Sequence, residues 1–106
     1  MAQPQPQREK DSVRVDPKHY SVEIDNDQVR VLRARYGPHE KSLMHAHPST
    51  VAVFLNDSRV RMTFPDGRTE ERDMKAGQTN FSGPEEHLPE NLTDRTLDVI
   101  VIELKR

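Results

Sequence analysis

The sequence predicts an all-β fold, either a sandwich or a barrel of antiparallel strands. Apolar and polar residues alternate in short runs, as they do in half-buried strands. Gly, Pro, Asn and Asp separate these runs at short intervals, which is typical of tight turns. No apolar repeat of helical period persists over several turns, so we do not expect helices to form the core.

The first expected strands lie in the N-terminal half of the chain. Residues 20–25 alternate between apolar and polar side chains, and Asp25-Asn26-Asp27 signals a turn after them. Residues 29–36 resume the strand pattern until Gly37-Pro38 interrupts it. Residues 42–47 predict a short strand that a proline terminates.

The central expected strands form a buried run and a hairpin. Residues 51–55 are continuously apolar, as in a strand that is buried on both faces. Residues 59–64 alternate, and their apolar members are assigned to the core: Val60, Met62 and Phe64. Pro65-Asp66-Gly67 predicts a hairpin turn that leads into a polar strand over residues 69–74.

The last expected strands follow the turn at Ala76-Gly77. Residues 80–81 predict a short strand, and residues 82–84 read as a loop. Residues 96–104 contain LDVIVIEL, which is apolar on both faces. Because both faces need cover, we expect a homodimer.

The composition indicates one small folded domain. The chain has 106 residues, of which 32% are hydrophobic and 32% charged, so the expected core is thin. Residues 1–17 are rich in Gln, Pro and charge and predict a flexible arm. Residues 18–106 are then the folded domain.

Charge and residue usage exclude several functional classes. The net charge is -2, with basic and acidic residues interspersed, so we expect no nucleic-acid partner. No apolar run approaches membrane-spanning length, and the first residues lack the apolar core of a secretory signal. The chain has no cysteine, which excludes thiolate metal sites and fits a cytoplasmic protein.

Three histidines are the candidate metal ligands. His45 and His47 are two residues apart on an expected strand, so they point to the same face. His87 follows in the segment GPEEHLPEN. Three imidazoles with an open position are typical of catalytic zinc and of some non-haem iron sites. A His-X-His pair also occurs on ordinary surfaces, so histidines that bind nothing remain an alternative.

The order of the histidines, strands and turns along the chain resembles that of the two sequence motifs of the cupin superfamily. The segment GPHEKSLMHAHPSTVAVFLND is similar to the first cupin motif, although Asn56-Asp57 stands where a glycine turn is usual. The segment AGQTNFSGPEEHLPEN is similar to the second motif, with the Gly/Pro pair scrambled as Gly83-Pro84 and a shortened spacing to the histidine. The matching residues are Gly37, Pro38, His45, His47, Gly77, His87 and Asn91.

The resemblance implies a double-stranded β-helix, or jelly-roll barrel, with a divalent metal ion near one mouth. It implies His45, His47 and His87 as ligands. The family's glutamate ligand would fall at Val51, which cannot ligate. Cupins with three-histidine sites include thiol dioxygenases and diketone-cleaving dioxygenases, so the resemblance implies a dioxygenase that acts on a small molecule.

Loss of the acidic ligand would leave the full dipositive charge on the metal and more open positions. Such a site favours a chelating or enolisable anionic substrate. Iron is expected if the chain is an oxygenase, and zinc, nickel and manganese are the other candidates. Glu40 is the candidate among neighbouring acids to replace the glutamate. A non-catalytic small-ligand cupin and a metal-dependent isomerase or hydrolase remain open.

The other polar residues have plainer expected roles. Asn91 is expected to secure a local turn. Arg33 and Arg35 would hold a carboxylate substrate if their face turned inward, but we expect them on a solvated outer face. His39 is expected to be an exposed loop residue, and the pattern assigns His19 no role.

Overall fold

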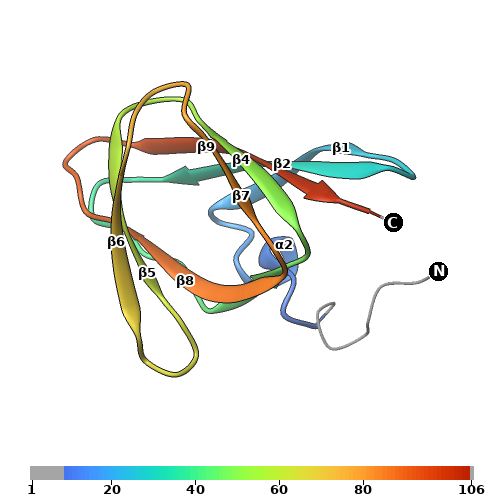
Figure 1. Ribbon diagram of the computed structural model, residues 1–106, viewed down its shortest axis with the longest axis horizontal. Coiled ribbons are helices and arrows are strands. Elements are labelled where there is room, and N and C mark those ends of the chain that lie inside the picture. Colours follow the sequence, from blue (N-terminus) through green and yellow to red (C-terminus); the bar gives the residue numbers. More distant parts are fainter. Residues whose placement is uncertain (1–8, 106) are drawn as a thin grey trace.

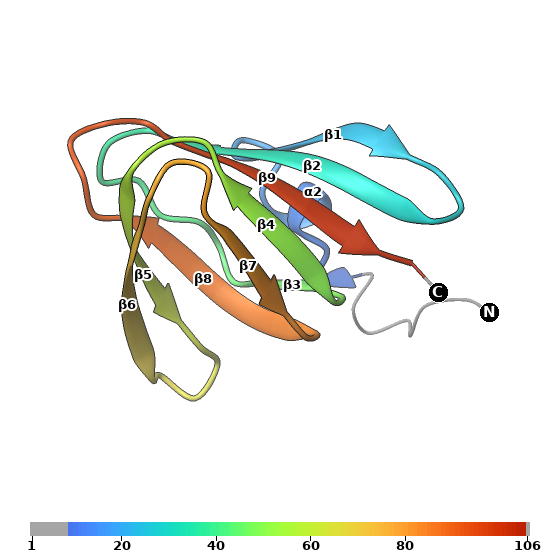
Figure 2. The same cartoon turned by 45° about the horizontal axis from the view of Figure 1, so that its top comes forward.

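Two antiparallel sheets face each other in the computed structural model, which describes residues 9–105 (Figure 1). The strands are β1 (Tyr20–Asp25), β2 (Val29–Tyr36), β3 (His45–His47), β4 (Thr50–Phe54), β5 (Ser58–Thr63), β6 (Thr69–Met74), β7 (Thr79–Ser82), β8 (Glu85–Asn91) and β9 (Leu97–Leu104). The five-stranded sheet has the order β1-β2-β9-β4-β7, and the four-stranded sheet the order β3-β8-β5-β6. Figure 2 shows β4 and β7 continuing the sheet that β1, β2 and β9 begin. The predicted all-β barrel is confirmed.

The core lies between the facing sides of the two sheets, where period-two alternation places every second side chain. In β9, Leu97, Val99 and Val101 are buried, while Ile100 and Ile102 on the opposite face are only partly covered. The buried apolar cluster draws on both sheets and comprises Tyr20, Leu32, Ala34, Tyr36, Phe54, Val60, Met74, Leu97, Val99 and Val101. The predicted core residues Val60 and Phe64 are buried, and Met62 packs against the cluster.

Two predicted turns depend on glycine. Gly67, in the β5–β6 hairpin, has a φ of 88°, and Gly77, before β7, has a φ of 84°. Side chains rarely adopt this left-handed region, whereas glycine does so at little cost. These turns set the register that places β6 and β7 beside the interior.

Strand β8 is not predicted by the sequence pattern. It pairs with β3 on one side and with β5 on the other, so it lies inside its sheet. Its buried positions are His87, Pro89 and Asn91, which are not apolar β-formers. The apolar alternation that reveals the other strands is therefore absent from this one.

The segment from Glu9 to Pro17 differs from the expected flexible arm. It contains the short helix α2 (Ser12–Val15), and Ser12 is fully buried. The Ala46 N–H donates to Lys10 O at 2.7 Å, so the segment pairs with the free edge of β3 and satisfies its backbone. Residues 1–8 of that predicted arm lie outside the described residues. No helix among residues 9–105 has the length and hydropathy to cross a bilayer.

Asn91 secures the loop between β8 and β9, as expected. Its Nδ2 donates to three carbonyl oxygens, of Tyr36, Gly37 and Arg95, and its Oδ1 accepts from the N–H and hydroxyl of Thr93. Asn91 is fully buried.

Replacing Asn91 by alanine is expected to lower the free energy of unfolding by about 2–4 kcal/mol, because several buried groups lose their partners together. The metal stoichiometry of the folded fraction is expected to be unchanged. Urea unfolding and elemental analysis check the two parts. Unaltered stability would show that water replaces this network without cost.

Candidate metal centre

The structure brings His45, His47 and His87 together. The pairing of β3 with β8 sets His45 opposite His87, and His47 lies on the same face as His45. The ring centroids are 4.9 Å apart for His45 and His47, and 5.0 Å apart for His45 and His87. One nitrogen of each ring lies within 4.8 Å of the others, and all three residues are buried. Three buried imidazoles at this spacing can hold one metal ion.

Each of the three rings is oriented through its Nδ1 atom, which has a hydrogen-bond acceptor. A ring that donates from Nδ1 is the tautomer whose Nε2 carries the free lone pair, as metal ligation requires. The contacts are His45 Nδ1 to Leu43 O at 2.8 Å, His47 Nδ1 to Glu103 Oε2 at 2.6 Å, and His87 Nδ1 to Glu85 Oε1 at 2.8 Å.

The Nε2 atom of His45 supplies the test of whether the site fits a metal. It is buried and has no hydrogen-bond partner among residues 9–105. A buried polar nitrogen without a partner costs free energy. A metal ion between the three Nε2 atoms would satisfy it, and the neutral nitrogen donor set suits first-row divalent ions. The residues therefore fit a divalent metal.

No carboxylate occupies the position of the fourth cupin ligand. Strand β4 turns Thr50 and Ala52 toward the interior, and Val51 pairs with Phe81 and Ile102 from the other face. The inward positions next to the expected ligand position are thus Thr50 and Ala52 rather than Val51. None of these side chains can supply an acidic ligand.

Glu103 is a functional residue that the sequence pattern missed. It is only 3% exposed, and it accepts hydrogen bonds from His47 and from Arg30 Nε, the latter at 2.8 Å. Burial alone would raise the pKa of Glu103, but the bonds from His47 and Arg30 outweigh it and lower the pKa. Glu103 is therefore an ionised carboxylate directly behind His47.

Glu85 has the same relation to His87. The hydrogen bond from His87 lowers the pKa of Glu85, so this carboxylate is also ionised. Both acids had a sequence signal. Glu103 continues the inward phase of Leu97, Val99 and Val101, and Glu85 is two residues before His87 on the same strand face.

The acids that the sequence placed nearest the histidines lie elsewhere. Glu40 accepts from the Gly37 N–H at 2.8 Å and contacts His19 Nε2 at 2.9 Å. These two bonds, with Lys18, lower the pKa of Glu40 to about 2. Glu40 is not among the residues that could share the metal, which are the three histidines. Glu86 pairs with Lys10, and Glu90 with Arg61.

His19, to which the pattern assigned no role, supports His45 through a buried network. Its ring stacks on Tyr36 with centroids 4.3 Å apart, and its Nδ1 lies 2.7 Å from Asp16 Oδ2. Ser42 Oγ donates to the same Asp16 oxygen at 2.7 Å and lies 3.0 Å from His45 Nδ1. The orientation of His45 thus depends on groups from the segment before β1.

The remaining predicted positions are mostly as expected. Arg33 and Arg35 pair with Asp98 on the outer face, and His39 is an exposed loop residue bonded to Asp94. Phe54 is buried in the core. Phe81 is 64% exposed because β7 turns it outward at the edge of its sheet.

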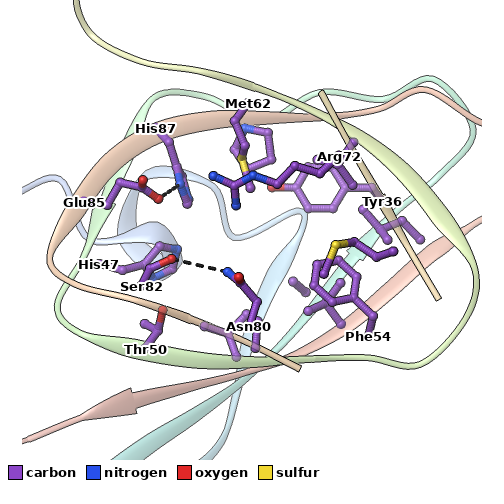
Figure 3. A pocket seen from close by; sticks show the side chains of 18 of the residues that line it. Tyr36, His47, Thr50, Phe54, Met62, Arg72, Asn80, Ser82, Glu85 and His87 are labelled. Atoms are coloured by element: carbon purple, nitrogen blue, oxygen red, sulfur yellow. Dashed lines mark hydrogen bonds and ion pairs between the residues drawn. The ribbon is translucent and has the colours of Figure 1, made fainter. Parts of the chain in front are cut away.

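A cavity of about 80 Å³ lies beside the histidines, between the two sheets. Figure 3 shows His47, His87 and Glu85 along one side of it, with Arg72 and Asn80 reaching in from other strands. The rest of the wall is largely apolar and includes Phe54, Met62, Met74, Val99 and Val101. A metal ion at the histidines would border a small, partly apolar chamber.

The metal-free protein is expected to lose stability as the pH falls from about 6.5 toward 4.5. Burial and the neighbouring histidines lower the pKa of His45 to about 3, and burial lowers the pKa of His87 as well. In this range the unfolded chain binds protons at both imidazoles and the folded chain does not. The free energy of unfolding that these two histidines contribute above their unfolded-state pKa is therefore lost as the pH falls toward their folded-state pKa.

Urea unfolding of chelator-treated protein, at about pH 7.5 and about pH 5, measures this dependence. The His45→Asn variant serves as the comparison and is expected to show a shallower dependence. A wild-type midpoint that does not change between the two pH values would contradict the shifted pKa values.

Several solved structures have the same fold. A cupin domain from Bordetella pertussis is 25% identical over 82% of this chain and 92% of its own, with a TM-score of 0.77. A protein with a double-stranded β-helix domain from Klebsiella pneumoniae is 16% identical, with a TM-score of 0.66 over 80% and 74% of the two chains. A cupin family protein from Methanocaldococcus jannaschii is 15% identical, with a TM-score of 0.63 over 83% and 82%. No protein-family model matches the sequence, and no curated protein matches it.

The two facing sheets, the solved neighbours and the histidine cluster agree with one another. Both segments that resemble cupin motifs contribute their histidines to one buried cluster, as in the family they resemble. The chain has the double-stranded β-helix fold of cupin proteins, and His45, His47 and His87 form a group that could hold a metal ion.

Proposed function

We propose that the chain is a metal-dependent dioxygenase that acts on a small chelating or enolisable organic molecule. The observation that carries the proposal is a set of three imidazoles, without an acidic ligand, beside a partly apolar cavity. A redox-active divalent metal, when bound there, would have open positions for a chelating substrate and for dioxygen. Iron is the metal proposed.

The chain's own residues would hold, orient and shield the reactants. The three histidines hold the metal, and Glu103 and Glu85 keep two of them in the ligating tautomer. Met62, Phe54 and Val99 make the wall that excludes water from the apolar part of a substrate. Glu85 also borders the cavity, so its carboxylate is placed to hold a proton that an enolisable substrate loses.

The proposed reaction places both oxygen atoms of one dioxygen molecule in the products of one substrate molecule. Cleavage of a carbon–carbon bond of an enolised diketone supplies all the electrons, so no external reductant is needed. Anaerobically iron-loaded protein mixed with acetylacetone tests this in an oxygen electrode. Dioxygen uptake in step with substrate loss, absent from the His87→Ala variant, is the expected result. The same assay is then repeated with thiol substrates.

The alternatives give different readouts in the same assay. An isomerase or hydrolase would convert its substrate with zinc and without dioxygen, and Glu85 beside the cavity is the feature that favours it. A non-catalytic cupin would bind small ligands and convert none. Iron-loaded protein that binds ligands but leaves dioxygen untouched would count against the oxygenase.

We also propose that the chain works as a homodimer in the cytoplasm. The outer face of the five-stranded sheet carries adjoining apolar side chains from three paired strands: Val51, Val53, Phe81, Ile100 and Ile102. Phe81 is the most exposed of them. Light scattering is expected to give a dimer for the wild type and a monomer for Phe81→Asp. A monomeric wild type at about 100 μM would contradict it.

A further inference from the structure

Arg72 is the cationic side chain that lines the cavity. Strand β6 is polar except for Met74, and its alternation turns Glu71 and Asp73 outward and Arg72 toward the interior. Figure 3 shows the Arg72 side chain reaching across the cavity to the side where Met62 and His87 lie. Its side chain is 31% exposed, so the guanidinium is partly withdrawn from water.

The protein leaves much of this guanidinium available. Within residues 9–105, Arg72 donates one hydrogen bond, from Nη2 to Glu70 Oε1 at 2.8 Å. Arg59, which points outward from the same sheet, is bonded to two carboxylates, of Asp73 and Glu71, both at 2.8 Å. A guanidinium has five N–H donors in a fixed fork, so most donors of Arg72 remain for a ligand.

The charge around the cavity favours an anion. A dipositive metal at the histidines and the Arg72 guanidinium would border the same chamber. Glu85 faces it too but is bonded to His87, while Glu70, the partner of Arg72, has a side chain that is 42% exposed. With a metal bound, the chamber would combine a dipositive ion with a guanidinium that has free donors, and a bound anion would interact favourably with both.

We propose that the substrate of this site is a small organic carboxylate whose carboxylate group binds Arg72. The far end of the molecule, an oxygen or sulfur donor, would bind at the three histidines. A planar carboxylate matches the guanidinium fork with two parallel hydrogen bonds. Asn80 and Ser82 line the same cavity and offer further polar contacts. This inference rests on the proposed metal-dependent function and names its substrate class.

The size of the cavity limits the substrate. A water molecule occupies about 10–15 Å³ on this measure, so the chamber has room for roughly five to eight non-hydrogen atoms. The apolar wall from Phe54, Met62 and Met74 suits a short hydrocarbon segment between the two polar ends. Hydroxy, oxo or sulfanyl acids of three to five carbons fall in this class.

Calorimetric titration of zinc-loaded protein tests the inference without any turnover. The probes are 2-, 3- and 4-hydroxybutyrate, each compared with its uncharged amide. We expect at least one acid to bind about 10- to 100-fold more tightly than its amide, the range of a charge-assisted contact. In Arg72→Gln this preference is expected to disappear while metal content stays the same. Arg59→Gln is the matched control on the outer face and should retain the preference.

Each outcome separates the carboxylate inference from the proposed oxygenase. Equal binding of acids and amides to the wild type, or an unchanged preference in Arg72→Gln, would overturn the carboxylate assignment even if dioxygen is consumed. A preference that depends on Arg72, in protein that consumes no dioxygen, would support the assignment and remove the oxygenase. If Arg72→Gln fails to fold, Arg72→Lys keeps the charge without the fork. It should then show a weakened preference, and a full one would contradict the paired contact.

Discussion

Replacing His45 by alanine is expected to weaken binding of a divalent metal by about 100-fold or more. The Nε2 of His45 is buried and lacks a partner among the described residues, and one ring nitrogen of His45 lies within 4.8 Å of one from His47 and one from His87. Two remaining imidazoles would leave the ion with too few protein ligands for tight binding. His47→Ala and His87→Ala are expected to have effects of similar size.

Competition with a chromophoric chelator, with zinc as the probe, measures these affinities. His39→Ala is the matched control, because His39 is exposed and bonded to Asp94 away from the cluster. It should bind zinc as tightly as the wild type. Circular dichroism shows whether each variant is folded. A folded His45→Ala variant with wild-type affinity would remove His45 from the site.

Replacing Glu103 by alanine is the second large expected effect, with a loss of about 3 kcal/mol in the free energy of unfolding. The variant leaves Arg30 with only Asp11 as its partner and deprives His47 Nδ1 of its acceptor. Since both contacts are buried or nearly so, water compensates them poorly. Metal affinity is expected to fall about 10- to 100-fold, because His47 loses the group that orients it.

Glu103→Gln separates the two roles of this residue. It keeps an acceptor for His47 but removes the negative charge, so a smaller loss of stability is expected, together with weaker metal binding. Glu71→Ala, in the exposed ion pairs of β5 and β6, is the control and should change neither property measurably. Unchanged zinc affinity in Glu103→Ala would show that His47 needs no carboxylate behind it.

Glu103 and Glu85 would offset part of the charge that an acidic ligand at the metal would have offset. The sequence alone suggests a metal whose dipositive charge is offset by nothing. In the structure, two ionised carboxylates are hydrogen-bonded to the Nδ1 atoms of His47 and His87, on the side of each ring that faces away from a metal bound at Nε2. They can make the imidazoles better donors without occupying a coordination position. The site would thus combine open positions with partial charge compensation.

The sequence was sufficient to predict the barrel and the three histidines that the structure brings together. The alternation of apolar and polar residues indicated β1, β2, β5 and β9. The His-X-His spacing placed His45 and His47 on the same face of one strand. What it could not show was the pairing of β3 with β8, because the inward side of β8 is polar. Without that pairing, Glu85 cannot be assigned to the cavity side.

Other features depend on contacts between distant segments. The residues before β1 order because β3 has a free edge for Lys10 and Asp11 to pair with, which their polar composition does not reveal. Arg72 belongs to a strand that is polar up to its last residue, Met74, so the pattern gave no apolar alternation to distinguish this inward arginine from the outward Arg59 and Arg61. In the sequence, the arginines that we weighed as partners of a carboxylate substrate were Arg33 and Arg35. The structure places both on the outer face of the sheet.

Elemental analysis of the untagged wild-type protein tests whether this fold holds a metal ion through His45, His47 and His87. A tag would add histidines of its own. We expect about one divalent ion per chain, either as purified or after reconstitution with iron or zinc and removal of the excess. Protein that is folded, yet takes up no metal under either condition, would contradict it.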